Sequence, residues 1–389
     1  MTLRKVAIIA GEHSGDQLAA GLVRELNSRV SEPIELVGVG GPALQAQGLN
    51  SLFDYSELSL IGFTAVLSKL PKLIWRISQA ARAIIDAKPD CLIIVDSPDF
   101  THRVARKVRR ALPDLKIINY VCPSVWAWKP QRAPAMRAYI DHVLSVLPFE
   151  PEIVAKLDGP PLTYVGHRLM NDPGLLAARK AQLDRRAPSG QIAGIPVCLL
   201  LPGSRRSEIT RLSADFSKTA KELIEILGEV RFVLPVATGR EQLVRDAISS
   251  WDFDVELAIG EEAKWKAFGR ADVAIAASGT VLLELSLAGV PAISLYRLDF
   301  IASFLVRLVY TWSGSLPNLI ADRVVILEYY QNEIRPGRVA RLARQLIADP
   351  LTRRAVLADH DRVYQRMEVE HPPEENAADV VLNLVNSGS

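Results

Sequence analysis

The chain has 389 residues, of which 49% are hydrophobic and 23% are charged, so it is a globular protein long enough for two or three domains. Its 46 Lys and Arg residues nearly balance 44 Asp and Glu residues, and the net charge of +2 gives no overall field that favours nucleic acid. Three widely separated cysteines, and six histidines without metal-ligand spacing, argue against a disulfide framework and a zinc site.

The N-terminal segment begins an alternation of strand-like and helix-like stretches. Its apolar run is too short for a signal peptide, and no later run is long enough to span a membrane, so we expect a cytoplasmic protein. Leu18, Leu22 and Leu26 recur at helical spacing after the first strand. This βαβ alternation predicts a parallel sheet with helices on both faces. Its strands are predicted over residues 6–10, 36–39, 92–95, 116–121, 142–146 and 163–165.

The second half of the chain repeats the alternation after a polar stretch. Residues 171–196 contain the turn-forming sequence Asn171-Asp172-Pro173 and a polar run, which together predict an interdomain linker. Strands are then predicted over residues 197–201, 232–236, 255–259, 273–276 and 292–295. We therefore expect two Rossmann-like α/β domains with a cleft between them. The predicted domains are residues 1–170 and 171–348, followed by C-terminal helices over 349–389 that pack back on the N-terminal domain.

Two carboxylates follow one of the predicted strands. The apolar run 91–95 is followed by Asp96 and Asp99, with Pro98 between them. Because ligands bind beyond the carboxyl ends of parallel strands, a carboxylate here can take a proton from a substrate hydroxyl. The structural alternative is a capping loop, with Asp99 or Thr101 as N-cap of the next helix. This stretch alone does not decide between the two.

The loop after the first strand, GEHSGD over residues 11–16, is the second candidate site. Small residues before a helix let the backbone approach a ligand, but the two acids of this loop oppose a pyrophosphate. A site for sugar hydroxyls fits better, with Glu12, Ser14 and Gly15 as candidate contacts. The alternative is a plain strand–helix turn in which Ser14 is the N-cap.

Two loops in the second half suit a nucleotide diphosphate. Arg205 follows a predicted strand and can bind a phosphate with two parallel hydrogen bonds. The backbone amides of Ser278, Gly279 and Thr280 open a helix and can face a phosphate, while Glu284, one turn later, suits a ribose diol. No Walker lysine is present, so we do not expect hydrolysis of the nucleotide. The structural alternatives are an exposed turn with solvated arginines and a helix cap beside a surface acid.

The segment over residues 61–84 has an apolar stripe beside a basic one at three- and four-residue spacing. This pattern fits a basic amphipathic helix at a membrane interface. It equally fits a helix that packs on the sheet with its basic residues outward. Trp75 favours the interface. The candidate membrane contacts are Phe63, Leu67, Leu70, Ile74, Trp75 and Ile77.

Taken together, the motifs resemble those of the lipid-A-disaccharide synthase family. They span nearly the whole chain and include GEHSGD (11–16), VDSPDF (95–100), PSVWAW (123–128), LLPGSR (200–205), ASGTVLLE (277–284) and SLPN (315–318). The resemblance implies a GT-B fold and an inverting transfer of 2,3-diacylglucosamine from its UDP derivative to 2,3-diacylglucosamine 1-phosphate. The products are the β-1,6-linked lipid A disaccharide 1-phosphate and UDP. It also implies no metal or other cofactor, a peripheral position on inner-membrane lipids, and often a homodimer.

The resemblance also implies roles for single residues. Asp96 is the expected general base, and Asp99 would hydrogen-bond the acceptor or tune Asp96. Trp126 would form a wall near the acceptor, although tryptophans are more often core residues. Arg205 and the amides of 278–280 would stabilise the leaving UDP, and Glu284 would hold its ribose. The remaining donor-side residues are Tyr296, Arg297, Asn318, Glu328 and Gln331, of which Asn318 is equally a turn residue when read in isolation.

The chain departs from the family pattern at a few positions, and two rival functions follow from the same motifs. Cys122 stands where Ser is common, and Lys129 stands where Arg is common. Residues 310–314 and 321–323 also differ from the usual family sequence, which leaves the acyl-chain preference open. One rival is another GT-B enzyme, such as a UDP-sugar epimerase, which would not need the amphipathic segment. The other is a non-catalytic UDP-binding membrane scaffold. UDP release with and without an acylated acceptor distinguishes all three.

Overall fold

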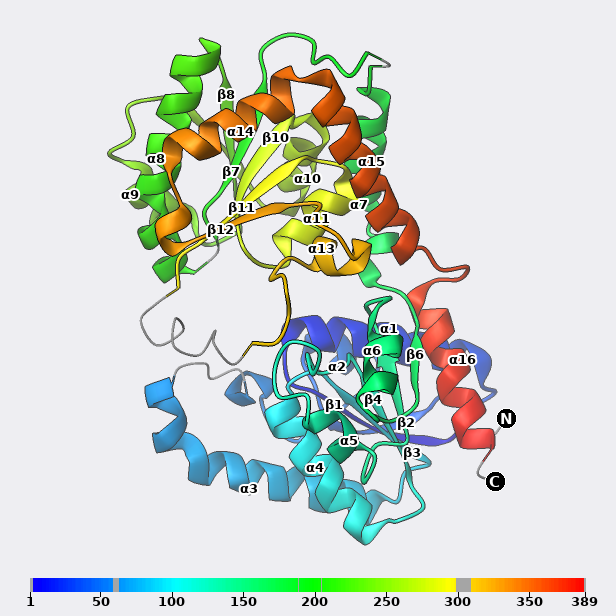
Figure 1. Cartoon of the computed structure of the whole chain (residues 1–389). Coiled ribbons are helices and arrows are strands. Elements are labelled where there is room, and N and C mark those ends of the chain that lie inside the picture. The colour runs from blue at the N-terminus through cyan, green and yellow to red at the C-terminus, as the bar shows by residue number, and fades with distance from the viewer. Residues whose placement is uncertain (1–2, 59–62, 188, 204, 299–308, 388–389) are drawn as a thin grey trace. The chain divides into compact units, whose positions relative to one another are not determined.

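The computed structural model describes residues 3–58, 63–187, 189–203, 205–298 and 309–387, with only the backbone of 63–70. It divides the chain into two compact units (Figure 1). The first unit comprises Met1–Arg168 and Val369–Ser389, and the second comprises Leu169–Glu368. The described residues of each unit form one parallel sheet with helices packed on it, so the predicted α/β class is confirmed.

The sheet of the first unit runs in the order β2-β1-β3-β4-β5-β6. Its strands are β1 (Lys5–Ala10), β2 (Glu35–Val39), β3 (Cys91–Val95), β4 (Lys116–Tyr120), β5 (His142–Ser145) and β6 (Leu162–Tyr164). The chain leaves β1 toward one side of the sheet and β3 toward the other, which makes this edge a topological switch point. Ala10 pairs with Val95 at this edge, so the loops after β1 and β3 start side by side.

Both faces of this sheet are buried by helices. The helices are α1 (His13–Arg29), α2 (Pro42–Gln45), α3 (Phe63–Ala87), α4 (Pro98–Ala111), α5 (Arg132–Met136), α6 (Glu150–Lys156) and α16 (Pro373–Asn386). Successive side chains of a strand point to opposite faces. Accordingly Val6 and Ile8 pack in the cluster that includes residues of α1 and α16, whereas Ala7 and Ile9 pack in the cluster that includes residues of α3 and α4. Burial on both faces explains why the strands read as continuous apolar runs.

The sheet of the second unit runs in the order β12-β11-β10-β7-β8-β9. Its strands are β7 (Val197–Leu201), β8 (Arg231–Val236), β9 (Val255–Ile259), β10 (Val273–Ala277), β11 (Ala292–Tyr296) and β12 (Leu327–Tyr330). Its helices are α7 (Pro173–Asp184), α8 (Arg206–Leu227), α9 (Glu241–Ile248), α10 (Glu261–Arg270), α11 (Val281–Ala288), α13 (Leu316–Ala321), α14 (Pro336–Ala348) and α15 (Pro350–Met367). The switch point of this sheet lies between β7 and β10, which pair directly.

The predicted linker over 171–196 is wrong for its first half, which forms α7. Asp172 is the N-cap and accepts a hydrogen bond from the Leu175 amide, and Pro173 occupies the first helical turn. The turn-forming residues therefore mark a helix start. At the other end of the chain, α15 packs on α11, α13 and α14 of the second unit, and α16 packs against α1 and β4 of the first unit.

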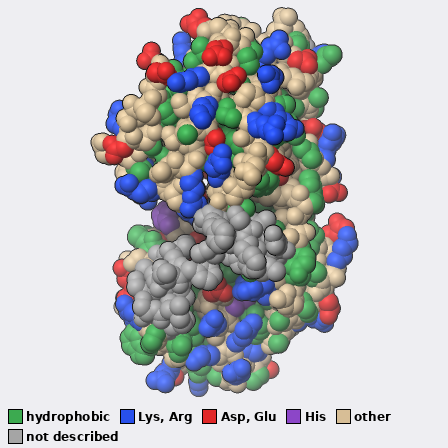
Figure 2. Space-filling model, turned by 60° about the vertical axis from the view of Figure 1, so that its left-hand side comes forward, with side chains coloured by type: hydrophobic (Ala, Val, Ile, Leu, Met, Phe, Trp, Pro, Cys, Tyr) green, Lys and Arg blue, Asp and Glu red, His purple; other side chains and the backbone are tan. Residues whose placement is uncertain are grey.

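Helix α3 contains the amphipathic segment for which the sequence allowed either a membrane interface or packing on the sheet. Ile77 was predicted to contact the membrane, but its side chain is only 3% exposed and belongs to the core of the first unit. Ile74 and Trp75 are more than half exposed, whereas the side chains of Phe63, Leu67 and Leu70 lie outside the described residues. The lower half of Figure 2 shows Lys and Arg side chains and hydrophobic ones gathered on the first unit. No described helix has both the length and the apolar character needed to cross a bilayer.

Candidate active site

Asp96 and Glu12 meet at the switch point of the first sheet. Glu12 follows β1 by two residues, and Asp96 follows β3 directly. The hydroxyl of Ser97, the residue after Asp96, donates to Glu12 Oε1 over 3.5 Å. Burial, and secondarily the charge of Asp96, raise the pKa of Glu12 above its ordinary value. The edge of the sheet therefore carries two interacting carboxyl groups.

The turn at Asp96 has an unusual backbone. Asp96 and Ser97 both have positive φ, at 55° and 45°, although neither is glycine. Each such conformation costs on the order of 1–3 kcal/mol and is typical of functional turns. Asp96 Oδ1 accepts from the Ser97 amide at 2.8 Å, and Thr101 Oγ1 donates to the Asp96 carbonyl at 2.8 Å. Ser97, rather than Asp99 or Thr101, is the N-cap residue of α4.

The GEHSGD loop is shaped by close packing against this turn. A Cβ on Gly11 would lie 2.4 Å from Ser97 Oγ, so only glycine fits there. Gly15 is buried, and a Cβ on it would lie 3.4 Å from Asp96 Cβ. Ser14 is exposed within α1, whose N-cap residue is Glu12, so the alternative with Ser14 as N-cap is wrong. The glycines of the loop thus serve its approach to Asp96.

The second acid of that loop has a structural role. The side chain of Asp16 is buried and accepts from the amides of Gly41, Ala43 and Leu44 at 2.8, 2.9 and 3.2 Å. These amides belong to the start of α2, so Asp16 satisfies donors that the short helix leaves unpaired. It is therefore Glu12, and not Asp16, that accompanies Asp96.

Asp99 and Trp126 differ from Asp96 in their surroundings. The Asp99 side chain is 83% exposed and pairs with Arg132 at 3.3 Å. Trp126 is half-buried, packs edge-on against Phe149 and donates from Nε1 to Glu150 Oε1 at 3.0 Å. The contacts of Trp126 within the protein explain its position without a ligand.

Glu150 itself was not predicted from the sequence. It is 2% exposed, and burial raises its pKa to about 7 despite hydrogen bonds from Ser145 and Trp126. The sequence around Glu150 does not indicate that this residue is buried at the start of α6.

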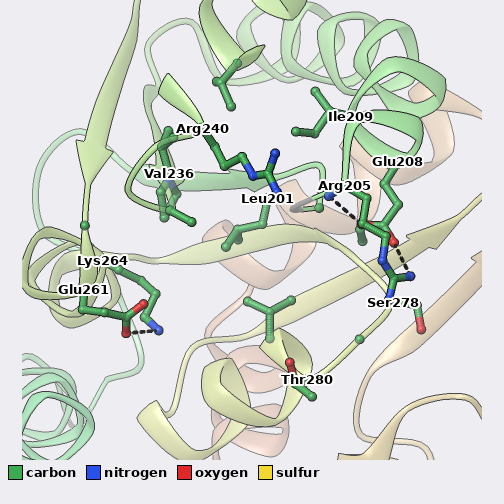
Figure 3. A pocket seen from close by; sticks show the side chains of 18 residues that line it. Leu201, Arg205, Glu208, Ile209, Val236, Arg240, Glu261, Lys264, Ser278 and Thr280 are labelled. Atoms are coloured by element: carbon green, nitrogen blue, oxygen red, sulfur yellow. Dashed lines mark hydrogen bonds and ion pairs between the residues drawn. The ribbon is translucent and has the colours of Figure 1, made fainter. Parts of the chain in front are cut away.

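A pocket of about 410 Å³ lies at the switch point of the second sheet (Figure 3). This volume is within the range of small-molecule sites, roughly 300–1,000 Å³. The loops after β7, β8, β9 and β10 all contribute to its wall. Its polar lining includes Arg205, Glu208, Arg240, Glu261, Lys264, Ser278 and Thr280.

Three cations line this pocket, and they differ in how far they are neutralised. Arg205 pairs with Glu208 at 3.2 Å but is 72% exposed. Lys264 bridges Glu261 at 2.7 Å and Glu284 at 3.2 Å. Arg240, which Figure 3 shows pointing into the pocket, makes no ion pair with any residue that the structure describes. Arg240 and Lys264 were not predicted as site residues. Each nevertheless follows a predicted strand by four or five residues, a position typical of ligand-binding residues in this kind of sheet.

The phosphate loop is only partly available. The Ser278 amide donates to the Leu295 carbonyl at 3.3 Å, which corrects the expectation that all three amides face a ligand. Gly279, at φ 152°, and Thr280 are exposed and line the pocket just before α11. Glu284 does not line it, and its carboxylate is paired with Lys264. The Gly279 and Thr280 amides therefore remain the candidates for phosphate contact.

The predicted residues from Tyr296 onward do not line the pocket, and most of them bond to other groups of the second unit. Arg297 makes a bidentate ion pair with Asp215 at 2.6 and 3.0 Å. Asn318 is 1% exposed, and its side chain bonds to the backbone of Val325 and Ile326, so it anchors a loop, as the turn alternative proposed. The other donor-side predictions are also engaged within the protein or half-buried: Glu328 accepts from Ser313 and Tyr330, Gln331 donates to Leu298, and Tyr296 is half-buried.

No group of three or more His, Cys, Asp or Glu residues in the described part of the chain is placed to hold a metal ion. The positive charge at the second switch point comes from arginine, lysine and backbone amides.

Comparison with known proteins gives one family. The family model described as lipid-A-disaccharide synthetase matches residues 6–382. Lipid-A-disaccharide synthase from Nitrobacter hamburgensis is 43% identical over 387 residues, which cover 99% of this chain and 96% of the relative. The same enzyme from Rhodospirillum centenum is 36% identical, with 98% of this chain and 94% of the relative covered.

Solved structures share the fold at low sequence identity. The glycotransferase of kitacinnamycin has a TM-score of 0.62 and 14% identity, with 99% of this chain and all of that one covered. UDP-GlcNAc 2-epimerase from Neisseria meningitidis, bound to UDP-GlcNAc, has a TM-score of 0.57 and 13% identity, with 98% of this chain covered. Their likeness confirms the predicted GT-B class of two Rossmann-like domains.

Proposed function

The chain belongs to the lipid-A-disaccharide synthase family, a glycosyltransferase family of lipid A biosynthesis, and from this premise we propose roles for its two switch points. The first unit binds the acylated glucosamine 1-phosphate acceptor, with Asp96 as general base. The second unit binds the UDP of the acylated donor. The observation that carries this proposal is the placement of opposite chemistry at equivalent edges, a strained carboxylate turn at one and a cationic pocket at the other.

The reaction is a single displacement. The 6-hydroxyl oxygen of the acceptor forms a bond to the anomeric carbon of the donor while the bond from that carbon to UDP breaks. The hydroxyl proton passes to the Asp96 carboxylate, and the electron pair of the broken bond leaves on UDP. Attack from the face opposite UDP inverts the anomeric centre.

Glu12 supports Asp96 as a positioning residue. Its raised pKa means that it holds a proton more readily than an ordinary Glu. The Ser97 hydroxyl donates to Glu12, and the glycine at position 11 leaves room for the Ser97 side chain.

UDP is stabilised by charge that is already in place. Arg205 and Arg240 face the diphosphate, and the exposed Gly279 and Thr280 loop before α11 offers backbone amides. The charge of Lys264 is shared with two carboxylates, so it contributes less than Arg240. Preorganised donors of this kind stabilise the negative charge that develops on the leaving group.

We further propose that the first unit lies against the inner membrane through α3. Two adjacent exposed apolar residues, Ile74 and Trp75, support this. Arg76 stacks on the Trp75 ring at 4.6 Å and forms a bidentate pair with Glu57, which holds Trp75 outward. The acylated substrates would reach the first unit from that surface.

The test is UDP release by the full chain, with and without 2,3-diacylglucosamine 1-phosphate, for the wild type and Asp96→Asn. Asn tolerates the positive φ that this position requires, so the turn is kept while the base is lost. We expect kcat to fall about a hundred- to ten-thousandfold. Asp114→Asn, an exposed acid beyond the far end of α4, is the matched control and should be unchanged.

Each rival has its own result in this assay. Near-wild-type turnover by a folded Asp96→Asn protein contradicts the assignment of the base. UDP release by the wild type without acceptor favours an epimerase-like reaction. No release under either condition favours a non-catalytic scaffold.

A further inference from the structure

A second, smaller pocket in the first unit has a strongly basic lining. It measures about 130 Å³, below the size of a site for a whole ligand, which is roughly 300 Å³ or more. Helices α4 and α5 and the segment after β4 form its walls. The lining residues are Pro98, Asp99, His102, Arg103, Arg106, Pro123, Arg132, Met136 and Tyr139.

The charges of this pocket favour an anion. Three guanidinium groups face one carboxylate, Asp99, which already pairs with Arg132 at 3.3 Å. His102, Arg103 and Arg106 follow Asp99 at three-, four- and seven-residue spacing, so all lie on one face of α4. Arg103 is exposed and makes no ion pair with any residue that the structure describes. Guanidinium groups match the geometry of phosphate oxygens.

His102, which also lines the pocket, has one ring nitrogen without a partner among the described residues. The hydroxyl of Tyr139 accepts from Arg106 at 3.1 Å and lies 3.0 Å from His102 Nδ1. The Tyr139 hydroxyl is therefore assigned as the donor to Nδ1, so the proton of the neutral histidine lies on Nε2. His102 is 7% exposed, and among the described residues its Nε2 has no hydrogen-bond partner. Burial, and then Arg106 and Arg132, lower its pKa to about 4, so it stays neutral and keeps one donor.

We propose that this pocket binds a phosphate monoester, and that its occupant is the 1-phosphate of the acceptor. The inference rests on the proposed function, because it places the phosphate of the same substrate whose hydroxyl Asp96 deprotonates. The size fits a phosphate group and not an acylated sugar. The pocket begins at Pro98 and Asp99, directly after the Asp96 turn, so base and phosphate site share the N-terminal half of α4. The phosphate of a membrane lipid headgroup has the same chemistry and is the alternative source.

The experiment compares two matched arginines of α4, Arg103→Gln inside the pocket and Arg110→Gln outside it. Both positions are exposed, and both substitutions remove one charge. The acceptor is supplied with and without its 1-phosphate, and kcat/KM is measured for each at fixed UDP-sugar donor. We expect Arg103→Gln to lower kcat/KM for the phosphorylated acceptor about ten- to a hundredfold, mainly through KM, and to leave the dephosphorylated acceptor unchanged. Arg110→Gln should keep the wild-type preference.

A second arm separates the two phosphate sources. Binding of each variant to phosphatidylglycerol vesicles is measured without acceptor. If Arg103→Gln and the wild type prefer the phosphorylated acceptor equally, the proposal is overturned. If Arg103→Gln, but not Arg110→Gln, then also loses vesicle binding, the pocket is assigned to lipid headgroups. Arg106→Gln, with circular dichroism as the folding check, must lose the same preference. A wild type that releases no UDP shows instead that the proposed function has failed, and the assignment of the pocket to the acceptor fails with it.

Discussion

The edge between β1 and β3 in the first unit and the edge between β7 and β10 in the second are equivalent places in two parallel sheets, yet they carry opposite chemistry. At the first edge, two carboxyl groups from neighbouring loops interact, one of them in a tight turn with positive φ. At the second, arginines and an exposed glycine loop surround a pocket of about 410 Å³. The topology decides where a ligand can bind, and the loops decide which ligand that is.

The two edges also differ in how they are built. The first depends on close packing, since Ser97 leaves no room for a Cβ at Gly11 and Asp96 adopts a left-handed backbone conformation. The second is open at Gly279, where a Cβ would meet nothing within 4 Å. A tight turn fixes the direction of a base, and an open loop leaves room for a diphosphate, so close packing and openness suit the two proposed roles.

The largest expected effect apart from loss of the base is a pH dependence confined to the first unit. Burial raises the pKa of Glu150 to about 7, from an ordinary value of 4.5. The fold therefore prefers the protonated form. The contribution of Glu150 to the free energy of unfolding is fully present below its pKa in the unfolded chain. It is lost as the pH rises through its higher pKa in the folded protein. Over that window the wild type should lose about 3 kcal/mol of unfolding free energy relative to Glu150→Gln.

Urea unfolding of both proteins at several pH values measures this difference. Gln has nearly the same shape: its oxygen can accept from Trp126, and its amide can face Ser145 Oγ, whose hydroxyl then donates to the Leu147 carbonyl instead. The variant should therefore lack this part of the pH dependence. A difference between the two proteins that stays constant with pH would contradict the assignment of the raised pKa to Glu150.

The second edge should respond to charge and salt instead. Arg240→Gln should weaken UDP binding about ten- to a hundredfold, because a charge-assisted hydrogen bond is lost. Lys264→Gln, the matched control, should cost less, because Glu261 and Glu284 already neutralise Lys264. Calorimetric titration with UDP at low and high salt measures both, and Asp96→Asn should bind UDP like the wild type. If Arg240→Gln and Lys264→Gln weaken UDP binding equally, then neutralisation by ion pairs does not decide how much each cation contributes.

Close packing at the first edge can be tested by adding one methyl group and then making room for it. Gly11→Ala should lower the free energy of unfolding by about 1–3 kcal/mol, because its Cβ overlaps Ser97. Ser97→Gly removes the overlapping atoms and suits the positive φ at that position. The double variant should therefore be more stable than the sum of the two single effects, measured by denaturant unfolding. Additive effects would mean that the two residues do not touch.

The sequence predicted what depends on periodicity and strand ends. The apolar runs predicted the described strands of the two sheets except β12, and the acids after 91–95 placed Asp96 at the correct edge. It could not show which polar side chains turn inward, because that depends on packing between distant segments. Asn318 looked like a ligand residue but bonds to Val325 and Ile326, and Ile77 looked like a membrane residue but is buried.

Residues supplied by less regular loops were missed for the same reason. Arg240 lies in a loop whose importance depends on the strand order, since β8 follows β7 in the sheet as well as in the chain. The ion pair of Lys264 with Glu284 joins α10 to α11, and the sequence around either residue does not predict it. The stretch Asn171-Asp172-Pro173 was typical of a linker and equally of a helix start, and only the contacts of α7 with α10 decide between them.

The smallest expected effect concerns the membrane surface of the first unit. Ile74→Ser should weaken binding to anionic vesicles about three- to tenfold, because an apolar side chain that is 54% exposed would no longer enter the lipid interface. Leu351→Ser is the matched control, since Leu351 lies in the second unit and is 70% exposed. Neither change should alter unfolding, because neither side chain belongs to a core. Vesicle sedimentation measures both. Equal weakening by the two variants would mean that exposed apolar area, rather than the placement of α3, brings the protein to the membrane, and no weakening by Ile74→Ser would remove that helix from the membrane surface.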